Sequence, residues 1–133
     1  MKDKIKIATI LPYKENYTYN KAQAAAIWVC DFFKYSEFKD NNFVFGNTDA
    51  KDYLTKNYIN IKINNLKSKL SSSTNEYCKN FIKKTKDFNF DIIEIHNRPH
   101  VFNYLKREID TKFILYFHND PLSMAGSKSV KER

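Results

Sequence analysis

Five short stretches of the chain are rich in β-branched and aromatic residues and are separated by polar or turn-forming segments. They are IKIATIL (5–11), NNFVFGN (41–47), NYINIKI (57–63), DIIEIHNRP (91–99) and KFILYFHND (112–120). Apolar runs of this length predict strands. The third stretch alternates apolar and polar residues, which predicts a more exposed strand nearer a sheet edge. The run 113–117 is apolar throughout, which predicts a central strand buried on both faces.

A helix is predicted between the first two strands. Asn20 is placed to cap it, and Gln23 three residues later gives a pattern close to a capping box. Trp28 and Phe32 lie four residues apart in this segment, so we expect both side chains to face the core. Small alanine side chains at the start of the helix would let it lie close to a sheet or a ligand.

Two further helices separate the later strands. Ser73 and Glu76 form a capping-box pattern before a helix that reaches about Lys86, and Pro99 suits the first turn of the last helix. Long helices between apolar strands predict an α/β fold, with a Rossmann-like, mainly parallel sheet flanked by helices. The length of 133 residues fits a single domain.

The net charge and the amino-acid composition indicate which classes of molecule the chain is suited to bind. The formal net charge is +8, which favours anionic partners such as a phospholipid surface, a lipid-linked phosphate or a nucleotide. Only three residues are arginine and no aromatic–basic RNA motif is present, so we expect no nucleic-acid partner. The two glycines, Gly46 and Gly126, are too few to build a glycine-rich phosphate loop.

The remaining composition favours a cytoplasmic protein. Cys30 and Cys78 show no metal-ligand spacing, so we expect free, buried thiols in a reducing compartment. The start of the chain lacks a secretory pattern, and the longest apolar run, 24–30, is far shorter than a membrane span. Peripheral contact with the inner face of the cell membrane, through the basic surface, is compatible with this location.

Polar residues follow the last two predicted strands directly. In an open parallel sheet, ligands bind beyond the carboxyl ends of the strands. Those ends carry His96-Asn97-Arg98 and His118-Asn119-Asp120. His118 at the end of its strand is therefore a candidate hydrogen-bonding or acid–base group, tuned by Asp120 or Arg98.

Structural alternatives exist for each of these residues. His96 and His118 could cap strands and bond to loop backbone, and Arg98 could pair with a nearby carboxylate such as Glu94 or Asp120. Asn97 and Asn119 are ordinary turn-forming residues. A zinc site made by His96 and His100 is disfavoured because Pro99 lies between them and no third ligand is evident.

The motifs HNRP and HNDPLSMAG…ER, with KIATILPYKE and AQAAAIWV before them, resemble a known family. They are similar to the N-terminal domain of family-4-type glycosyltransferases with the GT-B fold, especially bacterial enzymes of lipopolysaccharide and surface-polysaccharide synthesis. The resemblance implies that residues 1–133 form a single acceptor-side domain and that a donor-binding domain is absent from this chain. It further implies a nucleotide-sugar donor, a glycan or lipid-linked acceptor, no cofactor and no metal.

The resemblance also assigns roles to residues. His118 would be the catalytic residue beside the transferred sugar, and five other residues would line the acceptor side: His96, Asn97, Arg98, Asn119 and Asp120. Family members usually have glycines after the first strand, where the loop approaches the donor phosphates. Lys21 stands in this region here and is the candidate substitute.

Two functions of different classes therefore stay open. The first is the acceptor half of a sugar transferase, which the resemblance implies is a hexosyltransferase and which we expect to be inactive as an isolated chain. The second is a non-catalytic, flavodoxin-like binding module, which the scarcity of glycine favours.

Overall fold

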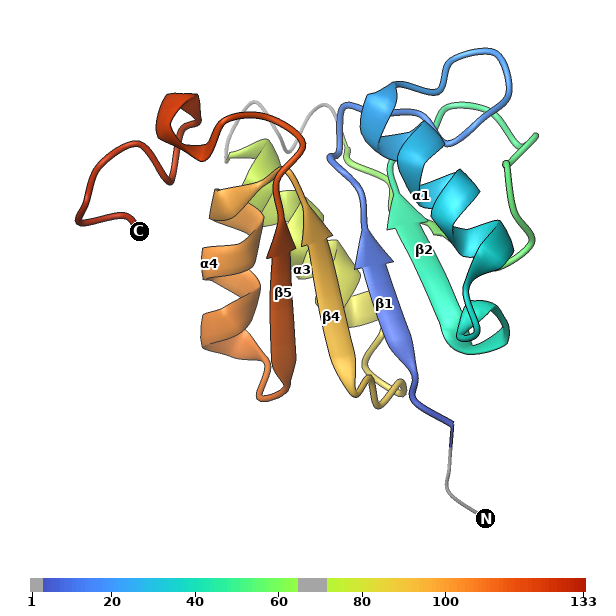
Figure 1. The fold of residues 1–133 in the computed structure, drawn as a ribbon. Coiled ribbons are helices and arrows are strands. Elements are labelled where there is room, and N and C mark those ends of the chain that lie inside the picture. Colours follow the sequence, from blue (N-terminus) through green and yellow to red (C-terminus); the bar gives the residue numbers. More distant parts are fainter. Residues whose placement is uncertain (1–3, 65–71) are drawn as a thin grey trace.

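The computed structural model describes residues 4–64 and 72–133, which contain one five-stranded sheet (Figure 1). All four strand pairs are parallel, and the strand order is β3-β2-β1-β4-β5. The strands are β1 (Ile7–Ile10), β2 (Asn42–Gly46), β3 (Tyr58–Asn60), β4 (Ile92–His96) and β5 (Lys112–Tyr116). This confirms the predicted Rossmann-like α/β fold, with β3 at an edge as expected.

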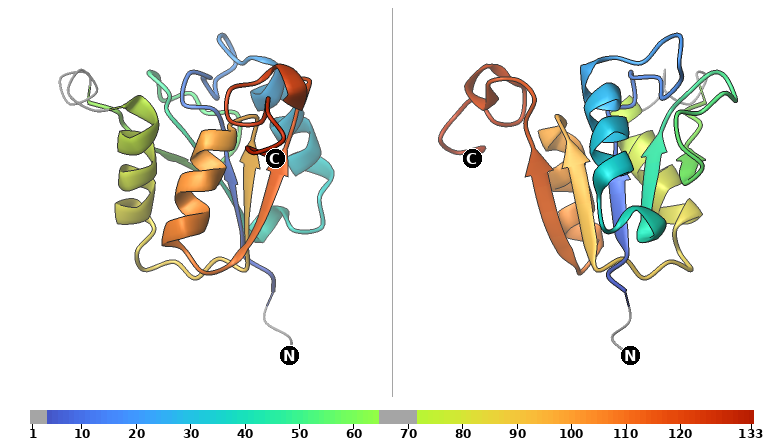
Figure 2. Two further views of the ribbon diagram at one scale, coloured as in Figure 1. Left: turned by 90° about the vertical axis from the view of Figure 1, so that its left-hand side faces the viewer. Right: turned by 45° about the vertical axis from the view of Figure 1, so that its right-hand side comes forward.

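Helices cover the two faces of the sheet unequally. The helix α1 (Ala24–Tyr35) lies over β1 and β2 on one face, whereas α3 (Ser73–Lys84) and α4 (Pro99–Glu108) lie side by side on the other (Figures 1 and 2). Two short 3₁₀ turns, η1 (Lys39–Asn41) and η2 (Pro121–Ser123), precede β2 and follow β5. No helix in the described ranges is both long and apolar enough to span a bilayer.

Two apolar clusters hold these layers together. The larger lies between the sheet and the α3–α4 pair, and its largest wholly buried side chains include Tyr77, Phe45, Phe81 and Leu105. The smaller lies under α1 and includes Tyr17 and Val29. Both free thiols are buried as expected. The alternation of side chains along each strand explains why both faces carry apolar residues.

The prediction for the fifth strand is wrong. β5 is an edge strand, and its side chains alternate between exposed and half-buried. Ile114 and Tyr116 are 45% and 36% exposed. By register they share the face of His96, where Trp28 of α1 contacts Tyr116, but the α1 helix itself lies mainly over β1 and β2 (Figure 2). An apolar run alone therefore did not reveal which strand would have neighbours on both sides.

The predicted start of the first helix also needs correction. α1 begins at Ala24, its N-cap is Gln23 without a side-chain hydrogen bond, and Asn20 is exposed in the preceding loop. The carboxylate of Glu15 instead accepts a hydrogen bond of 3.0 Å from the backbone N–H of Ala26. A buried carboxylate thus satisfies one of the free amides at the helix start. The cap was missed because Glu15 is eleven residues away in sequence.

The predicted orientation is wrong for Phe32 and holds in part for Trp28. Phe32 is 51% exposed, whereas Trp28 is half-buried and packs against the smaller apolar cluster. Their rings stack on each other with centroids 5.1 Å apart. Trp28 packs toward His96 of β4 and Tyr116 of β5, whereas Phe32 stays exposed beside it.

The other two helices begin close to their predicted positions. Pro99 occupies the first turn of α4 as expected. The N-cap of α3 is Ser72 rather than Ser73, and its hydroxyl accepts a hydrogen bond from Asn75 N–H at 3.0 Å. Glu76 does not complete a capping box, because one of its carboxylate oxygens accepts from the backbone N–H of Asn64 at 2.8 Å.

Candidate functional site

The two His-Asn motifs meet at the carboxyl edge of the sheet. His96 is the last residue of β4, and His118 follows the end of the neighbouring strand β5 by two residues. The Nδ1 atom of His96 lies 2.8 Å from Nε2 of His118, and the side chain of Asn97 donates a 2.7 Å hydrogen bond to Oδ1 of Asn119. Each residue of one motif therefore contacts its counterpart in the other, as their adjacent parallel strands allow.

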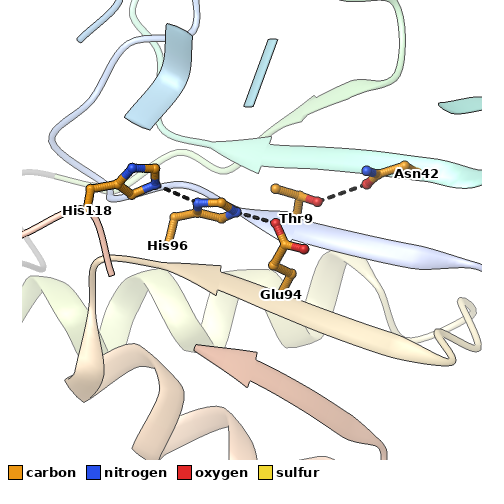
Figure 3. Close-up of polar contacts among 5 residues, drawn as sticks. All are labelled: Thr9, Asn42, Glu94, His96 and His118. Atoms are coloured by element: carbon orange, nitrogen blue, oxygen red, sulfur yellow. Dashed lines mark hydrogen bonds and ion pairs between the residues drawn. The ribbon is translucent and has the colours of Figure 1, made fainter. Parts of the chain in front are cut away.

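A third residue extends the histidine pair into a chain. Glu94 precedes His96 by two residues on β4, so both side chains point to the same face of the sheet. Oε1 of Glu94 makes a hydrogen bond with Nε2 of His96 (Figure 3). Beside it in β1, the hydroxyl of Thr9 donates to Asn42. The result is a continuous Glu94–His96–His118 chain that ends at the sheet edge.

The chain determines which ring nitrogens carry protons. An ionised Glu94 can only accept, so Nε2 of His96 is the donor and Nδ1 of His96 holds a lone pair. Nε2 of His118 must then donate to that lone pair. This leaves Nδ1 of His118 as an acceptor, and none of the described residues makes a hydrogen bond to it. Nδ1 of His118 is therefore able to accept a hydrogen bond or a proton.

Electrostatics keep His118 in the neutral form required of a base. Desolvation by burial lowers its pKa below the ordinary histidine value, and the neighbouring His96 lowers it further, while Glu94 opposes both effects. At neutral pH the ring is therefore mostly unprotonated. His96 is wholly buried, so it positions His118 and does not itself reach a ligand.

Aromatic side chains surround the histidine pair. The centroid of the Trp28 ring lies 5.6 Å from the centroid of each imidazole, that of His96 and that of His118. The contact with His118 is edge-to-face. Tyr116 packs between them, 5.0 Å from His118 and 4.6 Å from Trp28. These rings form one wall of the site. They also exclude water from one side of the imidazoles, which disfavours a charged ring.

Asn97 connects the two loops through a strained backbone. Its φ angle of 58° lies in the left-handed region, which asparagine tolerates better than most residues. Its side chain donates to Asn119 and accepts from the backbone N–H of His118 at 3.2 Å. Its carbonyl accepts a 2.9 Å hydrogen bond from the Arg98 guanidinium. The residue is buried and acts mainly to hold the two motifs in register.

The remaining predicted site residues are less closely associated with the histidines. Arg98 lies over the ring of Tyr13 at 5.9 Å and forms no ion pair with Glu94 or Asp120 within the described residues. Asp120 caps η2 by accepting from the N–H of Leu122. Lys21 is exposed in the loop before α1, with no hydrogen bond or ion pair in the parts of the chain that the structure describes.

Two functional features escaped prediction from sequence. Glu94 was considered only as a partner for Arg98, although the E-x-H spacing on a strand does place both side chains on one face. Trp28 was expected in the core, and no local pattern indicates that it would pack against histidines from two distant strands.

The position of Glu15 gives a testable pH dependence. Burial raises the pKa of this carboxyl, although the Ala26 amide, Arg98 and His96 all act to lower it. The folded chain then holds a proton at pH values where the unfolded chain has lost it. Stability is therefore highest below the unfolded pKa and falls as the pH rises through the folded pKa.

We expect the Glu15→Gln variant to lack this fall, because glutamine still accepts from Ala26 and cannot ionise. Urea unfolding of both proteins between about pH 4 and pH 8 should show the variant gaining stability relative to the wild type as the pH rises. Glu37→Gln, at an exposed position, is the matched control and should show no such trend. A stability difference between Glu15→Gln and the wild type that is the same at every pH would contradict the assignment.

The site thus combines a polarised histidine, an aromatic wall and an asparagine bridge at the ligand-binding edge of a parallel sheet. This arrangement suits proton transfer from a hydroxyl group of a bound molecule. Comparisons with family models, with curated proteins and with solved structures found no match for this chain.

Proposed function

We propose that this chain is the acceptor-side domain of a sugar transferase and that His118 accepts the proton of the acceptor hydroxyl. The observation that carries the proposal is the free Nδ1 of His118 at the end of the Glu94–His96–His118 chain. The proposed donor is a nucleotide-sugar, and the proposed acceptor is a glycan of the lipopolysaccharide or surface-polysaccharide type. The resemblance of the HNRP and HNDP motifs supports this choice of reaction.

The chemistry balances with the groups at hand. The acceptor oxygen forms a bond to the anomeric carbon of the sugar while the bond from that carbon to the nucleotide diphosphate breaks, and its electron pair leaves with the diphosphate. The hydroxyl proton moves to Nδ1 of His118. The positive charge that develops on His118 is stabilised through His96 by the carboxylate of Glu94.

The first βα turn supports an acceptor role over a donor role. In donor-binding Rossmann-like domains the phosphates approach the start of the first helix. Here the carboxylate of Glu15 already occupies the Ala26 amide at the start of α1. This amide is therefore not free to bind a donor phosphate, so we propose that the donor is held chiefly by a second domain, with Lys21 near its edge.

The aromatic wall suits the apolar face of a sugar ring. Trp28 and Tyr116 are both partly accessible and lie against His118. A sugar that packs on these rings would bring a hydroxyl toward Nδ1 of His118. Asn119 and Asp120, both exposed on the adjoining loop, are the proposed hydrogen-bonding residues for the acceptor.

A binding experiment tests the assignment to the acceptor side. We expect core oligosaccharides from lipopolysaccharide to shift the backbone amides of Asn97 and His118 and the indole N–H of Trp28 in ¹H–¹⁵N spectra of the labelled chain. A nucleotide-sugar such as UDP-glucose should shift the same signals much less. Stronger binding of the nucleotide-sugar at these residues, or glycan shifts confined to the amino edge of the sheet, would overturn the assignment.

A further inference from the structure

A small pocket of about 230 Å³ opens at the same edge of the sheet as the histidine pair. Segments far apart in sequence supply its walls, and they include Tyr13, Lys14, Thr74, Arg98, His100 and Met124. Asn97 also lines it, and the side chain of Asn97 accepts from the backbone N–H of His118. Asn97 therefore lines the pocket and also contacts the proposed catalytic histidine, so the two sites are neighbours.

The charged side chains of the pocket, Lys14 and Arg98, form few polar contacts with other described residues. Lys14 is exposed and forms no ion pair with any described residue. The Arg98 guanidinium is held over the Tyr13 ring, and one of its terminal nitrogens donates to the carbonyl of Asn97. Its other N–H groups have no hydrogen-bond partner among the described residues. A guanidinium fixed in this way presents two parallel donors, the geometry that phosphate oxygens accept best.

Two nearby carboxylates are engaged elsewhere. Glu15 acts on Arg98 through space, but it is hydrogen-bonded to the start of α1. Glu132 acts on His100 at long range and accepts hydrogen bonds from the N–H and hydroxyl of Ser129. Neither carboxylate forms an ion pair with the pocket cations within the described ranges, so the cationic charge of Lys14 and Arg98 stays available.

The segment after η2 gives the pocket a defined shape. Gly126 has a φ of 92° and packs so closely on Pro99 and His100 that a Cβ atom would lie 2.9 Å from Cβ of Pro99. This contact brings the segment after η2 against His100, and both His100 and Met124 line the pocket. The volume is below the roughly 300 Å³ typical of sites for drug-sized ligands, so it suits a small charged group and not a whole nucleotide.

We propose that this pocket binds a phosphate monoester group carried by the acceptor. Lys14 supplies a point charge and Arg98 supplies the forked donors. The assignment of the phosphate to the acceptor rests on the proposed function, whereas the binding of phosphate in this pocket does not.

Titration with inorganic phosphate tests the pocket directly. The backbone amides of Lys14, Arg98 and His100 in the ¹⁵N-labelled chain should shift in a saturable manner. We expect Lys14→Met and Arg98→Lys to weaken phosphate binding by about tenfold each, the usual effect of losing a charge-assisted hydrogen bond. Lys112→Met removes the same charge at the amino end of β5 and should leave the affinity nearly unchanged.

The source of the phosphate follows from two further arms. Glucose 1-phosphate represents a soluble phosphorylated sugar, and vesicles with phosphatidic acid, against phosphatidylcholine alone, represent a lipid phosphate. Binding in either arm that Lys14→Met weakens and Lys112→Met does not supports the pocket, and the arm in which it occurs identifies the source. Equal weakening by both lysine variants would show a response to net charge and overturn the proposal.

Other results also decide the matter. Absence of shifts at the pocket amides at saturating phosphate would overturn the proposal. Lys14 is exposed, so its variant should fold even if Arg98→Lys does not. If phosphate binds as described but replacement of His118 leaves sugar transfer intact, the pocket stands and the proposed catalytic role fails.

Discussion

In the proposed sugar transferase, we expect the His118→Ala variant to turn over about 100-fold more slowly than the wild type, as loss of a positioned general base typically causes. The variant loses the proton acceptor at Nδ1, while the backbone N–H of residue 118 can still donate to Asn97. Initial rates of sugar transfer and thermal unfolding should be measured on the same preparation. A large loss of stability beside near-normal turnover would instead identify His118 as a structural residue.

The pH dependence of kcat/KM tests whether His118 acts as a base. The base must be unprotonated, so kcat/KM should rise with pH through the pKa of His118 and then level off. Because burial and His96 lower that pKa, the rise should lie below the ordinary histidine value of 6.5. Glu94 opposes the lowering, so Glu94→Gln should move the rise to still lower pH. A profile unchanged by Glu94→Gln would contradict the proposed role of the Glu94–His96–His118 chain.

The second large effect concerns the stability of the Asn97 bridge. Asn97→Ala removes the bonds to Asn119 and His118 and puts a Cβ-bearing residue without a compensating amide at a φ of 58°. Loss of buried hydrogen bonds costs roughly 1–3 kcal/mol and the left-handed backbone about 1–2 kcal/mol, so we expect a loss of about 3 kcal/mol. The free energy of unfolding from urea titration measures it.

A glycine variant divides this cost into its two parts. Asn97→Gly removes the same side-chain hydrogen bonds but adopts positive φ without strain. It should therefore be more stable than Asn97→Ala by about 1 kcal/mol. Asn103→Ala, at an exposed position on α4, should change stability by no more than about 0.5 kcal/mol. Equal stability of the glycine and alanine variants would show that backbone strain contributes nothing at this position.

The two predictions concern different aspects of the same edge. His118 is expected to affect turnover with little change in stability, because its ring is only partly buried. Asn97 is expected to affect stability first, because it is buried and joins both loops. The sequence motifs contain these residues side by side, yet their roles follow from burial and hydrogen bonding.

Much of the fold follows from local patterns in the sequence. Apolar runs of strand length, separated by amphipathic helices, predicted the five strands, the parallel sheet and its carboxyl edge as the place for a ligand. Pro99 at the start of α4 and the edge position of β3 were also predicted, although β3 is more buried than its alternating pattern indicated.

Only the tertiary structure decided which residues from distant parts of the chain contact one another. β5 is an edge strand because, among the described strands, it pairs only with β4, and an apolar run does not encode that placement. Glu15 caps α1 although it is eleven residues away in the sequence. Trp28 contacts His96 and His118 because α1, β4 and the loop after β5 pack together. Local sequence therefore determined which polar residues follow the strands at the carboxyl edge of the sheet. The proton-accepting state of His118 depends instead on contacts between residues far apart in the chain.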